Sequence, residues 1–207
     1  MESTEIEIIP TDSSGELGDL NADVFYKGIK CEIRIVSDKD ALRVNAYKSF
    51  KTDLIECLNY IEEYEHQSSK IIKTALFKSL VITYGRCFAE SKERGGIKLE
   101  PNHIFKRSEN VNHKVSHNYI IKLRNDHIAH HSDMDAEKSK LFFVIPPTIC
   151  PDKTPVVLTT SGKINIDDIS ELTTHRIKET INFVLEHVTK QVDRFLEKLK
   201  RSQFDSL

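Results

Sequence analysis

An arginine and a histidine near the middle of the chain have the side chains and the spacing that phosphodiester chemistry requires. Arg124 is followed directly by Asn125, and His130 comes after a five-residue spacer. A guanidinium holds the anionic oxygens of a phosphodiester through its planar fork of donors. An imidazole, whose unperturbed pKa is about 6.5, can take or give a proton near neutral pH. The pair therefore predicts phosphodiester chemistry that needs no metal ion and no other cofactor.

The helix expected to carry these residues limits how they can meet. On a continuous helix, six residues turn two side chains apart by about 120° in projection. Arg124 would then share a face with His127 and His131 rather than with His130. The guanidinium and the imidazole of His130 meet only if the helix ends near Ala129, or if they approach each other across a dimer.

Apolar residues at three- and four-residue steps predict an all-α fold, a bundle of four amphipathic helices. Asp168 and Glu171 resemble a capping box at the start of the last and longest helix. Short apolar runs within residues 141–166 predict a small β insert of two or three strands. The expected helical domain is 38–204, with helices over residues 38–64 and 71–88, from about 110 through Arg124, and from about 168 to 200.

Residues 1–37 are predicted to form a separate N-terminal lead-in. Residues 1–20 are rich in Ser, Gly, Asp and Glu and are expected to be flexible or weakly ordered. Residues 23–37 alternate around Lys27-Gly28, which predicts a β-hairpin.

Composition fits an ordinary globular protein, with 39% hydrophobic and 30% charged residues in 207. No apolar run approaches the ~20 residues that span a bilayer, and the first ten residues are acidic where an export signal would be basic. We therefore expect a cytoplasmic protein without membrane contact. The cysteines are scattered without a zinc-finger or disulfide pattern, and Cys57 and Cys87 are expected to be buried.

Positive charge is concentrated only locally. The net charge is −2, yet residues 1–40 hold ten acidic and four basic side chains, so the remainder is mildly cationic. This charge is too small for a surface that binds nucleic acid by electrostatic attraction alone. Any polyanion would have to be bound by a few cations at one site. Lys114 and Lys122 are the predicted RNA-binding lysines, with Lys106-Arg107 as a further part of the same phosphate track.

The residues around Arg124 resemble a known family. An arginine followed by Asn, Asp or His, and a histidine four to six residues further along a late helix of a four-helix bundle, form the signature of the HEPN superfamily. Here it is matched by Arg124, Asn125 and His130, and the stretch 120–131 is particularly similar to the AbiU2-like group of abortive-infection HEPN proteins. The resemblance covers the architecture of residues 38–200.

The resemblance implies a homodimeric, metal-independent ribonuclease in a bacterial defence or toxin setting, with RNA and an antitoxin protein as partners. His130 would act as the general base that activates an RNA 2′-hydroxyl. Arg124 would stabilise the phosphorane-like transition state, and Asn125 would orient Arg124 or the phosphate. Beyond what the resemblance implies, we expect His127 or His131 to assist as an acid. A non-catalytic HEPN-like module that binds RNA, a nucleotide or a protein is the alternative.

Simpler interpretations of the same residues stay open. Arg124 could form a solvated ion pair with Asp126 or Asp133, worth about 0–1 kcal/mol. His130 could satisfy the last carbonyls of its helix. His113/His117 and His127/His131 are spaced to bind one metal ion from one helix face, but neither pair has a positioned carboxylate, so no metal site is expected. On the second helix, Tyr84 is expected in the core and Arg86 at the cleft.

Overall fold

The computed structural model describes residues 6–10, 22–33, 36–106, 108–125, 139–144, 156–161 and 170–204. The chain divides into two compact units, Met1–Asp38 and Lys39–Leu207. The larger unit is mostly helical, as predicted, and none of its described helices combines the length and the hydropathy needed to cross a membrane.

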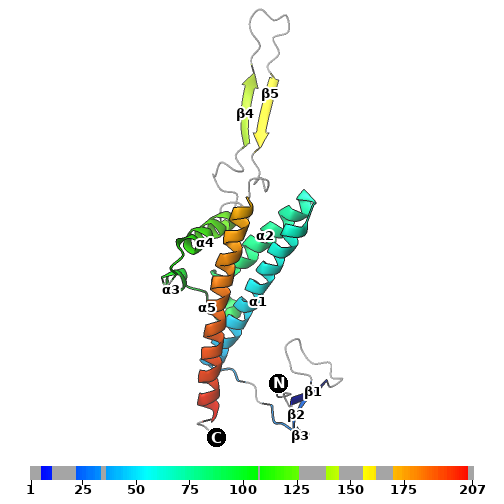
Figure 1. Cartoon of the computed structure of the whole chain (residues 1–207), viewed down its shortest axis with the longest axis vertical. Coiled ribbons are helices and arrows are strands. Elements are labelled where there is room, and N and C mark those ends of the chain that lie inside the picture. The colour runs from blue at the N-terminus through cyan, green and yellow to red at the C-terminus, as the bar shows by residue number, and fades with distance from the viewer. Residues whose placement is uncertain are drawn as a thin grey trace, which may run out of the picture. The chain divides into compact units, whose positions relative to one another are not determined.

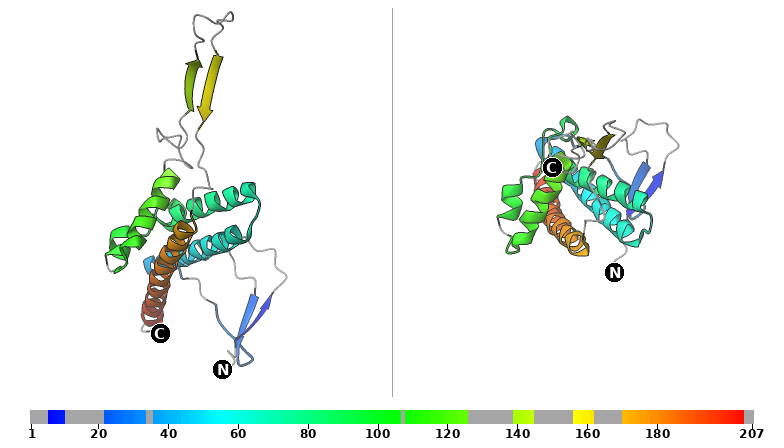
Figure 2. Two further views of the ribbon diagram at one scale, coloured as in Figure 1. Left: turned by 45° about the horizontal axis from the view of Figure 1, so that its top comes forward. Right: turned by 90° about the horizontal axis from the view of Figure 1, so that it is seen from above.

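Four long helices surround the core of the larger unit. Helix α1 contacts both α2 and α5, and α4 contacts α5 and α2, as Figures 1 and 2 show. The smaller elements η1 and α3 connect α2 to α4. The bounds are α1 Lys39–His66, α2 Lys70–Cys87, η1 Lys92–Arg94, α3 Pro101–Phe105, α4 Val111–Leu123 and α5 Glu171–Phe204.

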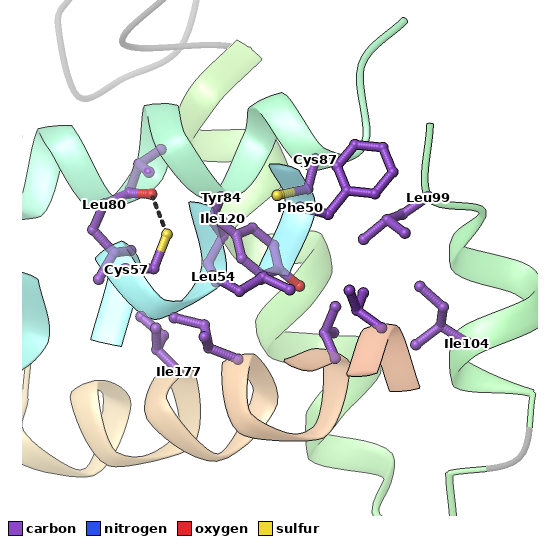
Figure 3. Packing of buried hydrophobic residues seen from close by; sticks show 14 of the residues in the cluster. Phe50, Leu54, Cys57, Leu80, Tyr84, Cys87, Leu99, Ile104, Ile120 and Ile177 are labelled. Atoms are coloured by element: carbon purple, nitrogen blue, oxygen red, sulfur yellow. Dashed lines mark hydrogen bonds between the residues drawn. The ribbon is translucent and has the colours of Figure 1, made fainter. Parts of the chain in front are cut away.

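The core consists of the apolar stripes of these helices. Phe50, Leu54 and Cys57 of α1 face Leu80 and Tyr84 of α2, and all are fully buried (Figure 3). The thiol of Cys57 donates to the carbonyl of Leu80 at 3.7 Å. Burial raises the pKa of the Cys57 thiol far above its usual range and that of Cys87 to about 12. The prediction that Cys57 and Cys87 are buried is confirmed.

Two details of the helical unit differ from the sequence-based expectation. The sequence predicted no helix between residues 88 and 110, but Pro101 occupies the first turn of the short helix α3, where its missing N–H has no cost. Helix α5 begins at Glu171, and the hydroxyl of Ser170 accepts from the Thr173 N–H at 3.2 Å, which is N-cap geometry. Asp168, the expected cap, lies outside the described residues.

The predicted β insert is a two-stranded antiparallel ribbon. Strand β4 (Ser139–Val144) pairs with β5 (Val156–Ser161), with Leu141 opposite Thr159 and Val144 opposite Val156. The third apolar run, residues 164–166, lies outside the described residues. The ribbon begins two residues before the predicted insert.

The N-terminal unit contains a three-stranded antiparallel sheet. Strand β2 (Ala22–Tyr26) pairs with β3 (Ile29–Lys30) through the predicted turn, where Lys27 and Gly28 have φ angles of 51° and 75°. Such a turn favours glycine because both central residues need positive φ. Strand β1 (Ile6–Pro10) pairs with β2 as well, so the expectation of a weakly ordered segment over residues 1–20 was wrong for these five residues.

Candidate functional site

The regular part of α4 ends at the predicted site. Its last α-helical residue is Leu123, and Arg124 and Asn125 continue it with π-helical geometry. π turns alter the angle between successive side chains and are frequent at functional sites. His127, His130 and His131 lie outside the described residues.

The stem of Arg124 lies directly against α2 at Gly85. A Cβ atom built on Gly85 would be 2.0 Å from Cδ, 2.7 Å from Nε and 3.2 Å from Cγ of Arg124. Any side chain larger than hydrogen at residue 85 would therefore displace the arginine. Glycine inside a helix costs about 1 kcal/mol relative to alanine. The close approach of Arg124 gives a physical reason for a glycine at this buried position.

The guanidinium of Arg124 is fixed at its other end by Asn125. Its Nη1 donates to Oδ1 of Asn125 at 3.2 Å. Arg124 is half-buried, whereas Asn125 is exposed. Among the described residues no carboxylate forms an ion pair with Arg124, and the alternative partners Asp126 and Asp133 lie outside them. The described half of the motif is thus a cation whose stem and head are both held.

The two lysines predicted to bind RNA lie on the same helix but apart. Lys114 and Lys122 are both exposed on α4. Eight residues separate them by about 12 Å along the axis and by about 80° around it. Lys114 lines a hollow beside α3 together with Lys106.

The first histidine pair on α4 is committed to structural contacts. His117 is 4% exposed, and its Nδ1 is 3.0 Å from the hydroxyl of Tyr84. Burial lowers the pKa of His117 to about 4, so the ring is neutral at pH 7. His113 instead hydrogen-bonds Ser108 through Nδ1 at 2.8 Å. The described ranges contain no group of three side chains that could hold a metal ion.

An ion cluster around a buried carboxylate joins α1, α2 and η1, and sequence reasoning missed it. Asp53 receives Nη2 of Arg86 at 3.1 Å on one oxygen and Nη2 of Arg94 at 3.3 Å on the other. The side chains of Asp53 and Arg94 are only 7% and 12% exposed. Burial raises the pKa of Asp53, and the two guanidinium groups oppose that rise. Arg86, which was expected at a cleft, binds Asp53 with its head, while 52% of its side chain stays exposed.

One sequence signal could have located this cluster. Asp53 falls on the apolar stripe of α1, one helical turn from Phe50 and from Cys57. A carboxylate at such a position needs a buried cationic partner. The arginines that supply it come from other segments.

Comparison with known proteins gives no relative. No family model matches the chain, and neither a curated protein nor a solved structure resembles it significantly.

Proposed function

We propose that this protein is a metal-independent RNA endonuclease of the HEPN type that acts in bacterial defence or as a toxin. The observation that carries the proposal is the held guanidinium of Arg124. Its stem lies against Gly85, its head binds Asn125, and no described carboxylate neutralises it. A fixed cation of this kind suits a phosphate whose charge grows during reaction.

The proposed reaction uses the RNA's own 2′-hydroxyl as nucleophile. His130 takes the hydroxyl proton, the 2′-oxygen attacks the adjacent phosphorus, and the bond to the 5′-oxygen breaks. That leaving oxygen receives a proton from His127 or His131. The products are a cyclic phosphate and a 5′-hydroxyl end. Arg124 stabilises the negative charge of the phosphorane-like transition state, which is worth about 3–4 kcal/mol for one well-placed donor.

A homodimer with two facing α4 helices is part of the proposal. Val111, Val115 and Tyr119 lie at four-residue steps on α4 and are 72%, 57% and 38% exposed. An apolar stripe on a helix is more stable against another apolar surface than in water. In a two-fold dimer the same stripe would meet its copy.

The first experiment measures RNA cleavage by the purified protein in EDTA. His130→Ala should abolish cleavage, and Arg124→Ala should lower its rate by about 10²–10³. The matched controls are His175→Ala and Arg201→Ala, because both residues are exposed on α5. Intact RNA with stoichiometric wild-type dimer would refute the proposed function.

Mixing two inactive variants tests how the site is assembled. If Arg124 of one subunit works with His130 of the other, a mixed dimer of Arg124→Ala and His130→Ala subunits regains one complete site. If both groups act within one subunit, the mixed dimer stays inactive. Val115→Glu, which places a charge on the apolar stripe, should abolish both dimer formation and cleavage.

A non-catalytic module that binds RNA, a nucleotide or a protein is the second candidate function. It is favoured by the chemistry of the described half of the motif, because the side chains of Arg124 and Asn125 donate hydrogen bonds to anions and are not proton-transfer groups. This candidate predicts that Arg124→Ala weakens RNA binding, whereas wild-type protein shows no turnover.

A further inference from the structure

A groove separates α3 from the middle of α5. Its central hollow has a volume of about 630 Å³. His103 and Lys106 lie on the α3 side, and His187, Lys190 and Arg194 come from α5 at steps of three and four residues, so they share one helix face.

Two smaller hollows share lining residues with this groove. A hollow of about 240 Å³ shares His103, His187 and Arg194 with the central one and reaches Tyr47 of α1. A hollow of about 270 Å³ shares Lys106 and reaches Lys114 of α4. We call the three together the α3–α5 groove. Its lining residues come from α1, α3, α4 and α5, an extent that fits a chain better than a compact ligand.

Cations outnumber carboxylates along the groove. Lys106, Lys114, Lys190 and Arg194 line it, against Glu100 and Glu186. Glu186 holds Lys190 at 2.5 Å, and this ion pair lowers the pKa of Glu186. The other three cations, Lys106, Lys114 and Arg194, form no ion pair with any residue in the described ranges. The groove therefore presents three cations that have no counter-ion among the residues that the structure describes.

We propose that the α3–α5 groove binds the phosphates of a single-stranded nucleic acid. Lys190 and Arg194 are about 6 Å apart along the helix axis, so they meet successive parts of an extended polyanion rather than one phosphate. Cations spaced along an open groove are how proteins follow a single-stranded backbone without reading its sequence. The choice of RNA as first probe rests on the proposed function, but the groove's binding requires no cleavage.

The test measures binding of a fluorescently labelled single-stranded RNA by anisotropy, in EDTA and in the His130→Ala background so that no probe is cut. The variant is Lys106→Ala/Arg194→Ala. Its matched control is Lys48→Ala/Arg201→Ala, which removes one lysine and one arginine exposed elsewhere. Circular dichroism confirms that each variant is folded.

The groove variant should bind RNA more weakly than the control at every salt concentration. Removing two phosphate contacts should also reduce the slope of log K against log salt by about 1.4, at 0.7 per contact on a single strand. Glu186→Gln should have the opposite effect, because it releases Lys190 from its carboxylate and adds a contact. Unchanged affinity and slope in both variants would overturn the proposal.

Two further probes identify the source of the phosphates. Single-stranded DNA of the same sequence should respond to the groove variant as RNA does, because backbone phosphates are common to both. ATP and inorganic diphosphate should compete only weakly. If they bind tightly and the oligonucleotides do not, the groove is a small-phosphate site and the proposal fails. Wild-type protein that binds as stated but leaves RNA intact would refute the endonuclease function alone.

Discussion

Replacing Gly85 by alanine is the most direct perturbation of the proposed site. The new Cβ would be 2.0 Å from Cδ of Arg124, and two carbon atoms need about 3.5–4.0 Å. Because α2 is fixed in the core, the flexible side chain of Arg124 must move, by roughly 1.5 Å or more. The substitution thus displaces the guanidinium without removing it.

Two terms of similar size set the effect on stability. Alanine in place of glycine inside a helix stabilises it by about 1 kcal/mol. Forcing Arg124 off its preferred rotamer costs about 0.5–1.5 kcal/mol. The free energy of unfolding should therefore change little in Gly85→Ala. In an Arg124→Ala background the second term vanishes, and the full gain of about 1 kcal/mol should appear.

Urea unfolding of the wild type, both single variants and the double variant gives the coupling free energy between residues 85 and 124. We expect about 0.5–1.5 kcal/mol. The stability changes of substitutions at independent sites add to within about 0.3–0.5 kcal/mol. A coupling free energy below that range would therefore refute the contact between residues 85 and 124. This result does not depend on whether the protein cleaves RNA.

RNA cleavage by Gly85→Ala measures the functional consequence. A displacement of about 1 Å in a catalytic group can cost roughly a hundredfold in rate, so we expect a folded protein with strongly reduced cleavage. Ala75→Gly is the matched control, because Ala75 is exposed on the same helix. It should lose about 1 kcal/mol of stability and keep its cleavage rate. Full cleavage by Gly85→Ala would refute the role of Arg124.

Three further predictions concern stability. Asp53→Ala should lower the free energy of unfolding by about 3 kcal/mol in urea, because it leaves Arg94 buried without a counter-ion. Asp40→Ala, which breaks a more exposed pair with Lys198, should cost much less, and equal losses would contradict this. The free energy of unfolding should fall by about 2 kcal/mol from about pH 7.5 to about pH 5, because the pKa of His117 is about 6.5 in the unfolded chain and about 4 in the folded one. His117→Gln should remove this pH-dependent loss of stability. The same pH profile in wild type and variant would disprove the role of His117. Ser170→Ala should lower the melting temperature through loss of about 1 kcal/mol of capping energy, and an unaltered melting temperature would argue against the cap.

The helices were predictable because their signal is local. Apolar residues recur at helical spacing within each segment, so the expected first helix over 38–64 is observed as Lys39–His66, and the second, over 71–88, as Lys70–Cys87. Strand β1 was missed because its signal is not local. It exists through pairing with β2, twelve or more residues away, and its own residues are flanked by polar ones.

The contacts that hold Arg124 could not be read from the motif. Residues 124 and 125 are adjacent, so a hydrogen bond between their side chains is possible in many folds. The sequence alone does not indicate that this bond forms. Gly85 is almost forty residues earlier, and its significance depends on how closely α4 approaches α2. A glycine in an otherwise apolar helix indicates a close approach, but the periodicity does not identify what approaches.

Two consecutive residues of α2 make contacts with different helices. Gly85 leaves room for the stem of Arg124, whereas Arg86 turns away by about 100° and binds Asp53 on α1. Substitutions at residue 85 should therefore move the guanidinium of Arg124 with little loss of stability. Substitutions at residue 86 should lower the stability and leave that guanidinium in place. Because the two residues share one rigid helix, a difference between their effects cannot be caused by general unfolding of α2. Comparing Gly85→Ala with Arg86→Ala in the same cleavage and unfolding assays thus separates the positioning of Arg124 from the integrity of the core.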